Sequence, residues 1–222
     1  MNFAHPLLEK SINIKEGEIS TIVIENPAAL RNTVDGISKS SPEFVLSKNF
    51  SPVEISKYAE FITDMFNVDF AAKKISTKLA AEAERISTDY QSETFSLLKS
   101  VNDYAELISE NIDLPIKFSL VENIDKLIKL INFSVDEENM DFSEALLTYM
   151  EICRSFFGKQ IFIFLNLKGF ISDSEFKLFC KNVAYEKFRV LLIESFDCSR
   201  ASEYEKKIII DNDLCVIFND NM

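Results

Sequence analysis

Two apolar runs, Lys159-Gln-Ile-Phe-Ile-Phe-Leu165 and Arg189-Val-Leu-Leu-Ile193, carry the main signal for the fold of this chain. Apolar runs without polar alternation predict strands that are buried on both faces of a sheet. Between them, Ser172-Asp-Ser-Glu175 is a capping-box-like sequence that predicts a helix extending to about Lys187. A buried strand, a helix and a second buried strand predict a right-handed parallel crossover, and therefore an α/β fold.

The N-terminal part of the chain carries similar signals. The β-branched stretch 18–25 lies between Gly17 and Pro27, which predicts a strand. Asn26 is a suitable cap for a helix from Pro27 to about Ile37. Three further elements are predicted: a short strand at 44–46, a helix opened by Ser51-Pro-Val-Glu54, and a third buried strand at 214–218.

The middle of the chain has a helical period. Apolar residues recur at steps of three and four between about Phe61 and Ile112, which predicts one long helix with a narrow, coiled-coil-like seam. Shorter helices are expected at 120–131 and 142–157. We therefore expect an α/β head, built from residues 1–62 and 156–222, and an inserted helical leg, residues 63–155.

Composition limits the classes of function. The chain has 222 residues, 24 basic and 36 acidic side chains, and a net charge of −12, which excludes a basic nucleic-acid coat protein. Any DNA site must be a local patch. Residues 1–10 show no secretion signal and no apolar segment is long enough to span a bilayer, so a cytoplasmic location is expected.

Several site types are excluded by missing residues. The four glycines are too far apart to build a phosphate-binding loop, and His5 is the one histidine. We expect His5 to be a partly exposed ring without a role. The four cysteines form no C-x-x-C pair, so they are interpreted as reduced, buried thiols rather than metal ligands.

The order of these elements resembles the Csn2 family, the spacer-acquisition proteins of type II-A CRISPR systems. The C-terminal third carries most of the resemblance, and the N-terminal strands and the end of the long helix follow the family in the same order. The stretches concerned are 159–166, 169–180, 188–194, 3–8, 11–14, 22–25 and 110–114.

This resemblance implies a head similar to a P-loop nucleotide-binding fold, with a mostly parallel sheet, and an elongated helical leg. It also implies a homotetrameric ring that binds the ends of double-stranded DNA through a positively charged hole, with calcium supporting the assembly. The family is not known for catalysis. Its partners in antiviral defence are the CRISPR integrase proteins and the type II effector nuclease.

Where a P-loop protein has glycines and a lysine, this chain departs from the pattern. The strand that ends at Ile24 continues into Glu25, Asn26 and Pro27, and Glu25 would repel a triphosphate. The acidic residue expected at the end of a second buried strand is replaced by Asn166, a poor Mg²⁺ ligand. The sequence therefore argues against ATP hydrolysis.

DNA binding requires cations, and the predicted leg supplies a sparse set. Lys74, Lys78 and Arg85 share one helix face, because they are separated by steps of four and seven. A solvated helix face is the alternative interpretation, but a ring would gather the cations into a belt. The candidate DNA-binding residues are Lys73, Lys74, Lys78, Arg85, Lys99, Lys117, Lys126 and Lys129.

Calcium requires several converging oxygens. Glu110, Asp113 and Glu122, with Asp125 nearby, are the candidates at the turn where the family is acidic. The stretch 115–118 departs from the family, since Lys117 stands where further carboxylates are expected. The acidic run 136–138 is interpreted as a solvated loop.

Two other functions stay open. A divergent ATPase or Mg²⁺-dependent nuclease would use carboxylates that follow the predicted strands, at Glu194, Asp197, Asp211 and Asp213. Loop solubility is the favoured explanation of these residues, because no general-base partner and no phosphate-binding arginine are evident nearby. A purely structural coiled-coil adaptor is the third possibility.

Overall fold

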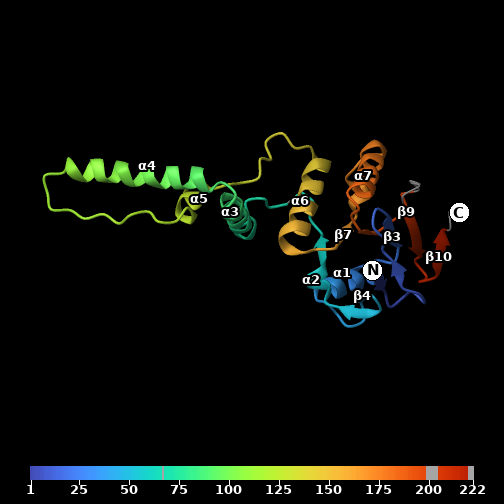
Figure 1. The fold of residues 1–222 in the computed structure, drawn as a ribbon. Helices are drawn as coiled ribbons and strands as arrows, with labels where there is room; N and C mark the ends of the chain where they lie inside the picture. Colours follow the sequence, from blue (N-terminus) through green and yellow to red (C-terminus); the bar gives the residue numbers. More distant parts are fainter. Residues whose placement is uncertain (67, 199–204, 220–222) are drawn as a thin grey trace. The chain divides into compact units, whose positions relative to one another are not determined.

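The computed structural model describes residues 1–66, 68–198 and 205–219 and divides into two compact units (Figure 1). The head unit comprises Met1–Val68 and Met140–Met222, and the leg unit comprises Asp69–Asn139. The head is a mixed α/β unit with a mostly parallel sheet, and the leg is helical, in agreement with the predicted fold class.

The main sheet of the head has six strands in the order β10-β9-β3-β8-β7-β6. All neighbouring strands are parallel except β9 and β10, which are antiparallel. The predicted unit of two parallel strands and an intervening helix is confirmed by β7, β8 and the helix between them. The strands are β3 (Ile19–Ile24), β6 (Ala59–Ile62), β7 (Ile161–Leu165), β8 (Val190–Glu194), β9 (Glu205–Ile210) and β10 (Val216–Asn219).

A second, antiparallel sheet has the strand order β2-β1-β4-β5. It covers part of the head together with helix α1 (Pro27–Ser38). Its strands are β1 (Asn2–Ala4), β2 (Ile12–Asn13), β4 (Val45–Lys48) and β5 (Ser51–Val53).

The main sheet is buried on both faces because its apolar runs do not alternate with polar residues. On one face, Val190 and Leu192 pack in a core shared with α6 (Phe142–Phe157) and α7 (Asp173–Tyr185). On the other face, Leu191 and Ile193 pack in a core with α1 and the second sheet.

The predicted helix caps agree with the structure at two helices, α1 and α7. The Asn26 side chain caps α1, and Ser172 and Glu175 form a reciprocal capping box at α7. Helix α6 has the predicted bounds, begins with a capping box from Asp141, and ends at Gly158 in a left-handed conformation.

Three predictions in the head are wrong. Ser51 and Pro52 lie in β5 rather than at a helix start, and the following helix, α2, is only Ile55–Tyr58. Strand β9 is absent from the prediction, because its first residues are charged. The strand predicted at 214–218 is the edge strand β10, where Ile217 and Phe218 are 48% and 54% exposed rather than buried.

The single helix predicted over 61–112 is wrong too. Residues up to Ile62 belong to β6, and the remainder forms α3 (Lys73–Ser87) and α4 (Gln91–Glu110). At the break, the hydroxyls of Ser87 and Thr88 donate to backbone carbonyl groups one turn earlier, at 2.7 Å each. Such bonds compete with helix continuation. The helix predicted at 120–131 begins later, as α5 (Asp125–Ile131).

The division of the chain differs from the predicted boundaries at 63 and 155. Helix α6, which the periodicity places in the leg, belongs to the head because Leu146, Met150 and Cys153 are buried in the core against the main sheet. Periodicity alone identifies such a helix but does not show which core receives its apolar face.

The cysteine prediction holds for two of the four residues. Cys153 and Cys180 are buried, whereas Cys198 is half-buried and Cys215 is exposed on the turn before β10. None of the four forms a disulfide. Within the described ranges, every helix is too short or too polar to cross a bilayer.

Candidate nucleic-acid interface and strand ends of the head

The turn between β3 and α1 occupies the position of a phosphate-binding loop. The backbone N–H groups at the start of α1 already have acceptors within the chain. The side-chain oxygen of Asn26 accepts the backbone N–H groups of Ala28 and Ala29, at 3.0 and 3.1 Å. The N–H of Leu30 donates to the Asn26 carbonyl at 2.9 Å, and Pro27 has no N–H. Because the first turn offers no free donor, it has no site for a phosphate group.

At the end of β7, Asn166 serves as a link between strands. It lies in a left-handed conformation, its side-chain oxygen accepts the N–H of Ser195 at 2.8 Å, and its own N–H donates to the Ile193 carbonyl at 2.8 Å. Asn166 thus joins the ends of β7 and β8. Its amide oxygen is engaged by the protein itself.

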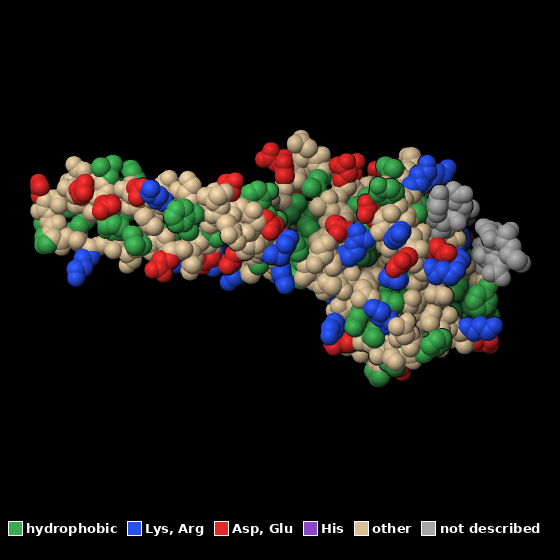
Figure 2. Space-filling view, in the orientation of Figure 1, with side chains coloured by type: hydrophobic (Ala, Val, Ile, Leu, Met, Phe, Trp, Pro, Cys, Tyr) green, Lys and Arg blue, Asp and Glu red, His purple; other side chains and the backbone are tan. Residues whose placement is uncertain are grey.

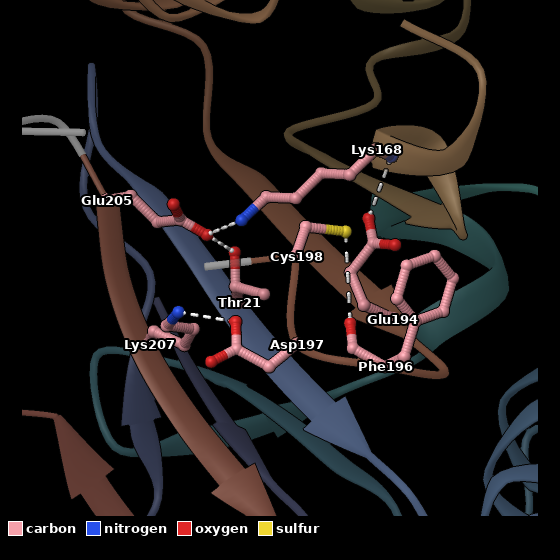
Figure 3. A network of polar contacts seen from close by, with 8 residues as sticks. All are labelled: Thr21, Lys168, Glu194, Phe196, Asp197, Cys198, Glu205 and Lys207. Atoms are coloured by element: carbon pink, nitrogen blue, oxygen red, sulfur yellow. Dashed lines mark hydrogen bonds and ion pairs between the residues drawn. The ribbon is translucent and has the colours of Figure 1, made fainter. Parts of the chain in front are cut away.

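Beside it lies a network of buried polar side chains (Figure 3). The Lys168 ammonium pairs with Glu205 at the start of β9, and both side chains are only 2% exposed. The Thr21 hydroxyl on β3 donates to the same carboxylate oxygen at 2.5 Å. The Lys168 backbone N–H donates to Glu194 at 3.1 Å. Lys168 is not among the site residues predicted from the sequence. The one sequence feature that could have indicated it is its position shortly after a buried strand.

Two of the other predicted strand-end carboxylates, Asp197 and Asp211, also have structural partners. Asp197 pairs with Lys207 at 2.6 Å, and Asp211 accepts the N–H groups of Asp213 and Cys215 at 2.9 and 2.8 Å in the turn between β9 and β10. Within residues 1–66, 68–198 and 205–219, no three His, Cys, Asp or Glu side chains gather as a metal site requires. These carboxylates are therefore distributed over separate structural contacts.

The expectation of a partly exposed His5 is wrong, since its ring is buried at 3% exposure. Nε2 lies 2.8 Å from the Thr33 hydroxyl, which itself donates to the Ala29 carbonyl. Nδ1 accepts the N–H of Leu7 at 3.2 Å. This pattern assigns the proton to Nε2 of a neutral ring. Burial lowers the pKa of His5 to about 4.

All eight predicted DNA-binding cations belong to the leg unit, on which they lie at the surface. Two have acidic partners on their own helix: Arg85 with Glu82 at 2.6 Å, and Lys129 with Asp125 at 3.7 Å. Lys117 lies between α4 and α5. The others lie on α3 (Lys73, Lys74, Lys78), α4 (Lys99) and α5 (Lys126).

The packing of α3 against α5 brings some of these cations together. Lys73 and Lys129 both line a groove of about 460 Å³, in which Ser76, Thr77 and Asn132 supply hydroxyl and amide groups. Cations that are far apart in the sequence thus share one groove, which Glu84, Asp125 and apolar residues such as Ile128 also line. Lys99 and Lys117 are not part of its lining.

Helix α4 has no buried residue, although it carries half of the predicted apolar seam. The segment that follows it is held by Asn102, whose side chain donates to the Val121 carbonyl at 3.1 Å and accepts the Val121 N–H at 2.8 Å. The exposed large apolar side chains on α4 and this segment include Phe95, Tyr104, Leu107, Leu114 and Leu120, with exposures of 56% to 72%.

The calcium candidates Glu110, Asp113 and Glu122 are all exposed at the far end of α4 and in the segment after it. They do not form a group of three metal-ligating side chains in the part of the chain that the structure describes. The calcium site stays a prediction, and it would require further oxygen ligands beside these three carboxylates.

The sequence model of the family described as "CRISPR-associated protein (Cas_Csn2)" matches residues 37–214, which is most of the chain. No curated protein matches the chain.

Among solved structures, the chain is similar to CbiO1 from Clostridium perfringens, part of the ABC transporter complex CbiONQ. The two share 11% identity with a TM-score of 0.51, over 94% of this chain and 79% of the other. A nucleotide-free ATP-binding cassette from an ABC transporter is 10% identical, with a TM-score of 0.48, over 94% and 83%. The likeness to CbiO1 supports a P-loop-type fold for this chain.

Proposed function

Because the chain belongs to the Cas_Csn2 family of CRISPR-associated proteins, we propose that it binds the ends of double-stranded DNA during spacer acquisition. In this proposal four copies form a ring in the cytoplasm, and the DNA threads a central hole lined by leg cations. The family match over residues 37–214 is the observation that carries the proposal. The position of all eight predicted cations at the surface of the leg supports it.

The proposed role is binding without catalysis. The donors of the first turn of α1 are used by Asn26, and Asn166 links two strands where a P-loop enzyme has an acidic metal ligand. A fold of this type without a phosphate site is suited to forming a stable body that presents a DNA-binding surface. The alternative, a divergent ATPase or Mg²⁺-dependent nuclease, rests on the P-loop-type fold alone.

Self-association is supported by the apolar surface of the leg. Large apolar side chains such as Phe95 and Tyr104 are 72% and 63% exposed, and α4 buries none of its residues in a single copy. Exposed apolar surface of this extent is typical of protein interfaces. We propose that copies of this chain cover it, which would also bring calcium ligands such as Glu110 together from different copies.

Electrostatics determine how DNA binding is tested. The net charge of −12 means that binding depends on local cations rather than on overall attraction. If each of four copies neutralises two phosphates, about eight contacts form, and the slope of log K against log salt concentration is about −7. The contacts are to phosphates, so affinity is expected to be independent of sequence.

The first experiment measures affinity for a linear duplex and for the same duplex as a closed circle, over a series of salt concentrations. Threading predicts binding of the linear form only, with the steep slope given above. Equal affinity for both forms excludes threading, and a slope near zero excludes phosphate contacts. Native mass measurement with and without calcium tests the ring and the role of the metal.

A matched pair of variants identifies the cations. Lys78 has no acidic partner within the described residues, whereas Arg85 on the same helix is held by Glu82. We expect Lys78→Gln to reduce the salt slope by about 0.9 for each phosphate that is no longer neutralised, and Arg85→Gln to change it less. No effect of either substitution would remove this face of α3 from the interface.

Catalysis is tested by incubating the protein with ATP or DNA and Mg²⁺. Neither phosphate release from ATP nor cleavage of DNA is expected. Phosphate release that disappears on changing Glu25, or DNA cleavage that disappears on changing Glu194, would favour the enzyme instead. The CRISPR integrase proteins and the type II effector nuclease are proposed partners, and co-purification of the tagged chain with each of them tests this.

A further inference from the structure

Helix α7 of the head has an exposed basic face that lies outside the set of DNA-binding residues predicted from the sequence. Lys177 and Lys181 are both exposed and one turn apart. Leu178 and Tyr185 lie beside them on the same face and are 51% and 82% exposed. Figure 2 shows Lys and Arg side chains on the side of the head where Figure 1 places α7.

The charge on this face is not neutralised within the described part of the chain. Neither lysine forms an ion pair there, in contrast to helix cations such as Lys39, which binds Asp35 at 2.7 Å. Two of the acids near the ends of α7 bond elsewhere: Glu175 caps the helix through Ser172, and Glu186 pairs with Arg154 at 3.5 Å. A third acid, Asp173, is exposed one turn before Lys177. The two lysines at the centre of the face therefore have no ion pair within the described residues.

The opposite face of α7 fixes the helix firmly to the head. Phe176, Phe179, Cys180 and Val183 are each at most 2% exposed in the core against the main sheet. The reciprocal capping box at Ser172 holds the first turn. The lysines thus project from a rigid support, so little conformational entropy of the backbone is lost when they bind a ligand.

We propose that the outer face of α7 is a second phosphate-contacting surface for duplex DNA, on the head rather than on the leg. This inference rests on the proposed function. One helical turn separates the two lysines by about 6 Å along the axis. Tyr185, one turn further, adds a hydroxyl donor of the kind that contacts phosphates.

Charge complementarity favours a polyanion over another copy of this chain. A second protomer docking on α7 would bury two ammonium groups that form no ion pair within the described residues, which is costly. Phosphate neutralises each lysine and releases counterions from the DNA, which is favourable at low salt. Leu178 and Tyr185 are exposed apolar side chains of the kind found in protein interfaces. The experiment must therefore also detect docking of a protein on this face.

The test compares the double variant Lys177→Gln/Lys181→Gln with the control Lys10→Gln/Lys57→Gln. The control removes the same charge from two exposed head lysines outside α7. Linear-duplex affinity is measured against salt concentration for both variants and the wild type, with native mass measured in parallel. All four lysines are exposed, so neither variant disturbs the core.

For each copy whose α7 touches the duplex, the two lysines add about 1.8 to the size of the slope that the leg cations give. The α7 variant is expected to lose this addition and to bind about 60-fold more weakly at 0.1 M salt. The control is expected to match the wild type. If the α7 variant binds with the affinity and the salt slope of the wild type, this inference is overturned, whereas the proposed function is not. A changed native mass with an unchanged slope would assign α7 to protein contacts instead. No binding by the wild type would overturn the proposed function itself.

Discussion

The ammonium of Lys168 pairs with the carboxylate of Glu205, and the hydroxyl of Thr21 donates to the same carboxylate, in a part of the head where both charged side chains are 2% exposed. This pair connects the segment after β7 with the first residue of β9. It therefore joins two elements on opposite sides of β3 and β8 in the main sheet.

Breaking this pair is expected to destabilise the head strongly. Lys168→Met leaves the Glu205 carboxylate buried and without its cation, which is expected to lower the free energy of unfolding by about 3–5 kcal/mol. The double variant Lys168→Met/Glu205→Leu removes both charges and is expected to recover most of that stability. Urea unfolding measures all three proteins.

Lys206 on the same strand supplies the control, because it pairs with Glu18 at the surface, where its side chain is 60% exposed. Lys206→Met is expected to change stability by less than about 1 kcal/mol. Equal effects of the substitutions at 168 and 206 would show that burial does not strengthen the first pair.

Gly36 of α1 is expected to be intolerant of a side chain. A methyl group at this position would lie 2.1 Å from the ring of Phe44, which is buried. Alanine gains about 1 kcal/mol in helix propensity but overpacks the core at a cost of about 1–3 kcal/mol. Because the overlap is severe, Gly36→Ala is expected to lower the melting temperature.

Gly169→Ala is the matched control, since nothing lies within 4 Å of a methyl group there. Adding Phe44→Leu to Gly36→Ala is expected to recover part of the stability by relieving the overlap. If Gly36→Ala is as stable as the wild type, α1 can move away from Phe44 without cost, which would contradict tight packing between them.

His5 predicts a pH dependence of stability. Burial lowers its pKa in the folded protein to about 4, from an ordinary value of 6.5. Between these two values the unfolded chain binds the proton and the folded chain does not, so stability decreases as pH falls from 6.5 towards 4. The slope from this group is about 1.4 kcal/mol for each pH unit.

The measurement is urea unfolding of the wild type and of His5→Gln at pH 7 and pH 5, a range in which most carboxylates stay ionised. The wild type is expected to lose about 2 kcal/mol more than the variant on acidification. Parallel losses in the two proteins would show that other groups cause the acid sensitivity.

Asn102 is expected to hold the segment after α4 in place. Its side chain makes two hydrogen bonds with the backbone of Val121, each contributing about 1 kcal/mol. Asn102→Ala is expected to increase the rate of protease cleavage within residues 112–124. Asn111→Ala serves as the control, because the Asn111 side chain donates to the Leu107 carbonyl of the preceding helix α4. Equal cleavage rates would mean that the two bonds do not order the segment.

The α/β class of the head follows from the amino-acid sequence alone. Two uninterrupted apolar runs require burial on both faces, and Ser172 and Glu175 fix the start of the helix between them through local contacts. The absence of a phosphate-binding loop after β3 follows in the same way, since it depends only on which residues come next in the chain. These features are local, so neighbouring residues are enough to predict them.

Features that join distant residues emerge only when the chain is folded. Three such features depend on contacts between residues that are far apart in the sequence. They are the burial of His5 against Thr33, the pairing of Lys168 with Glu205, and the position of α6 in the head. Periodicity shows that a helix has an apolar face, and composition shows that a lysine is present. Neither shows what that face or that charge meets, because the partner is selected by packing and by the order of strands in the sheet.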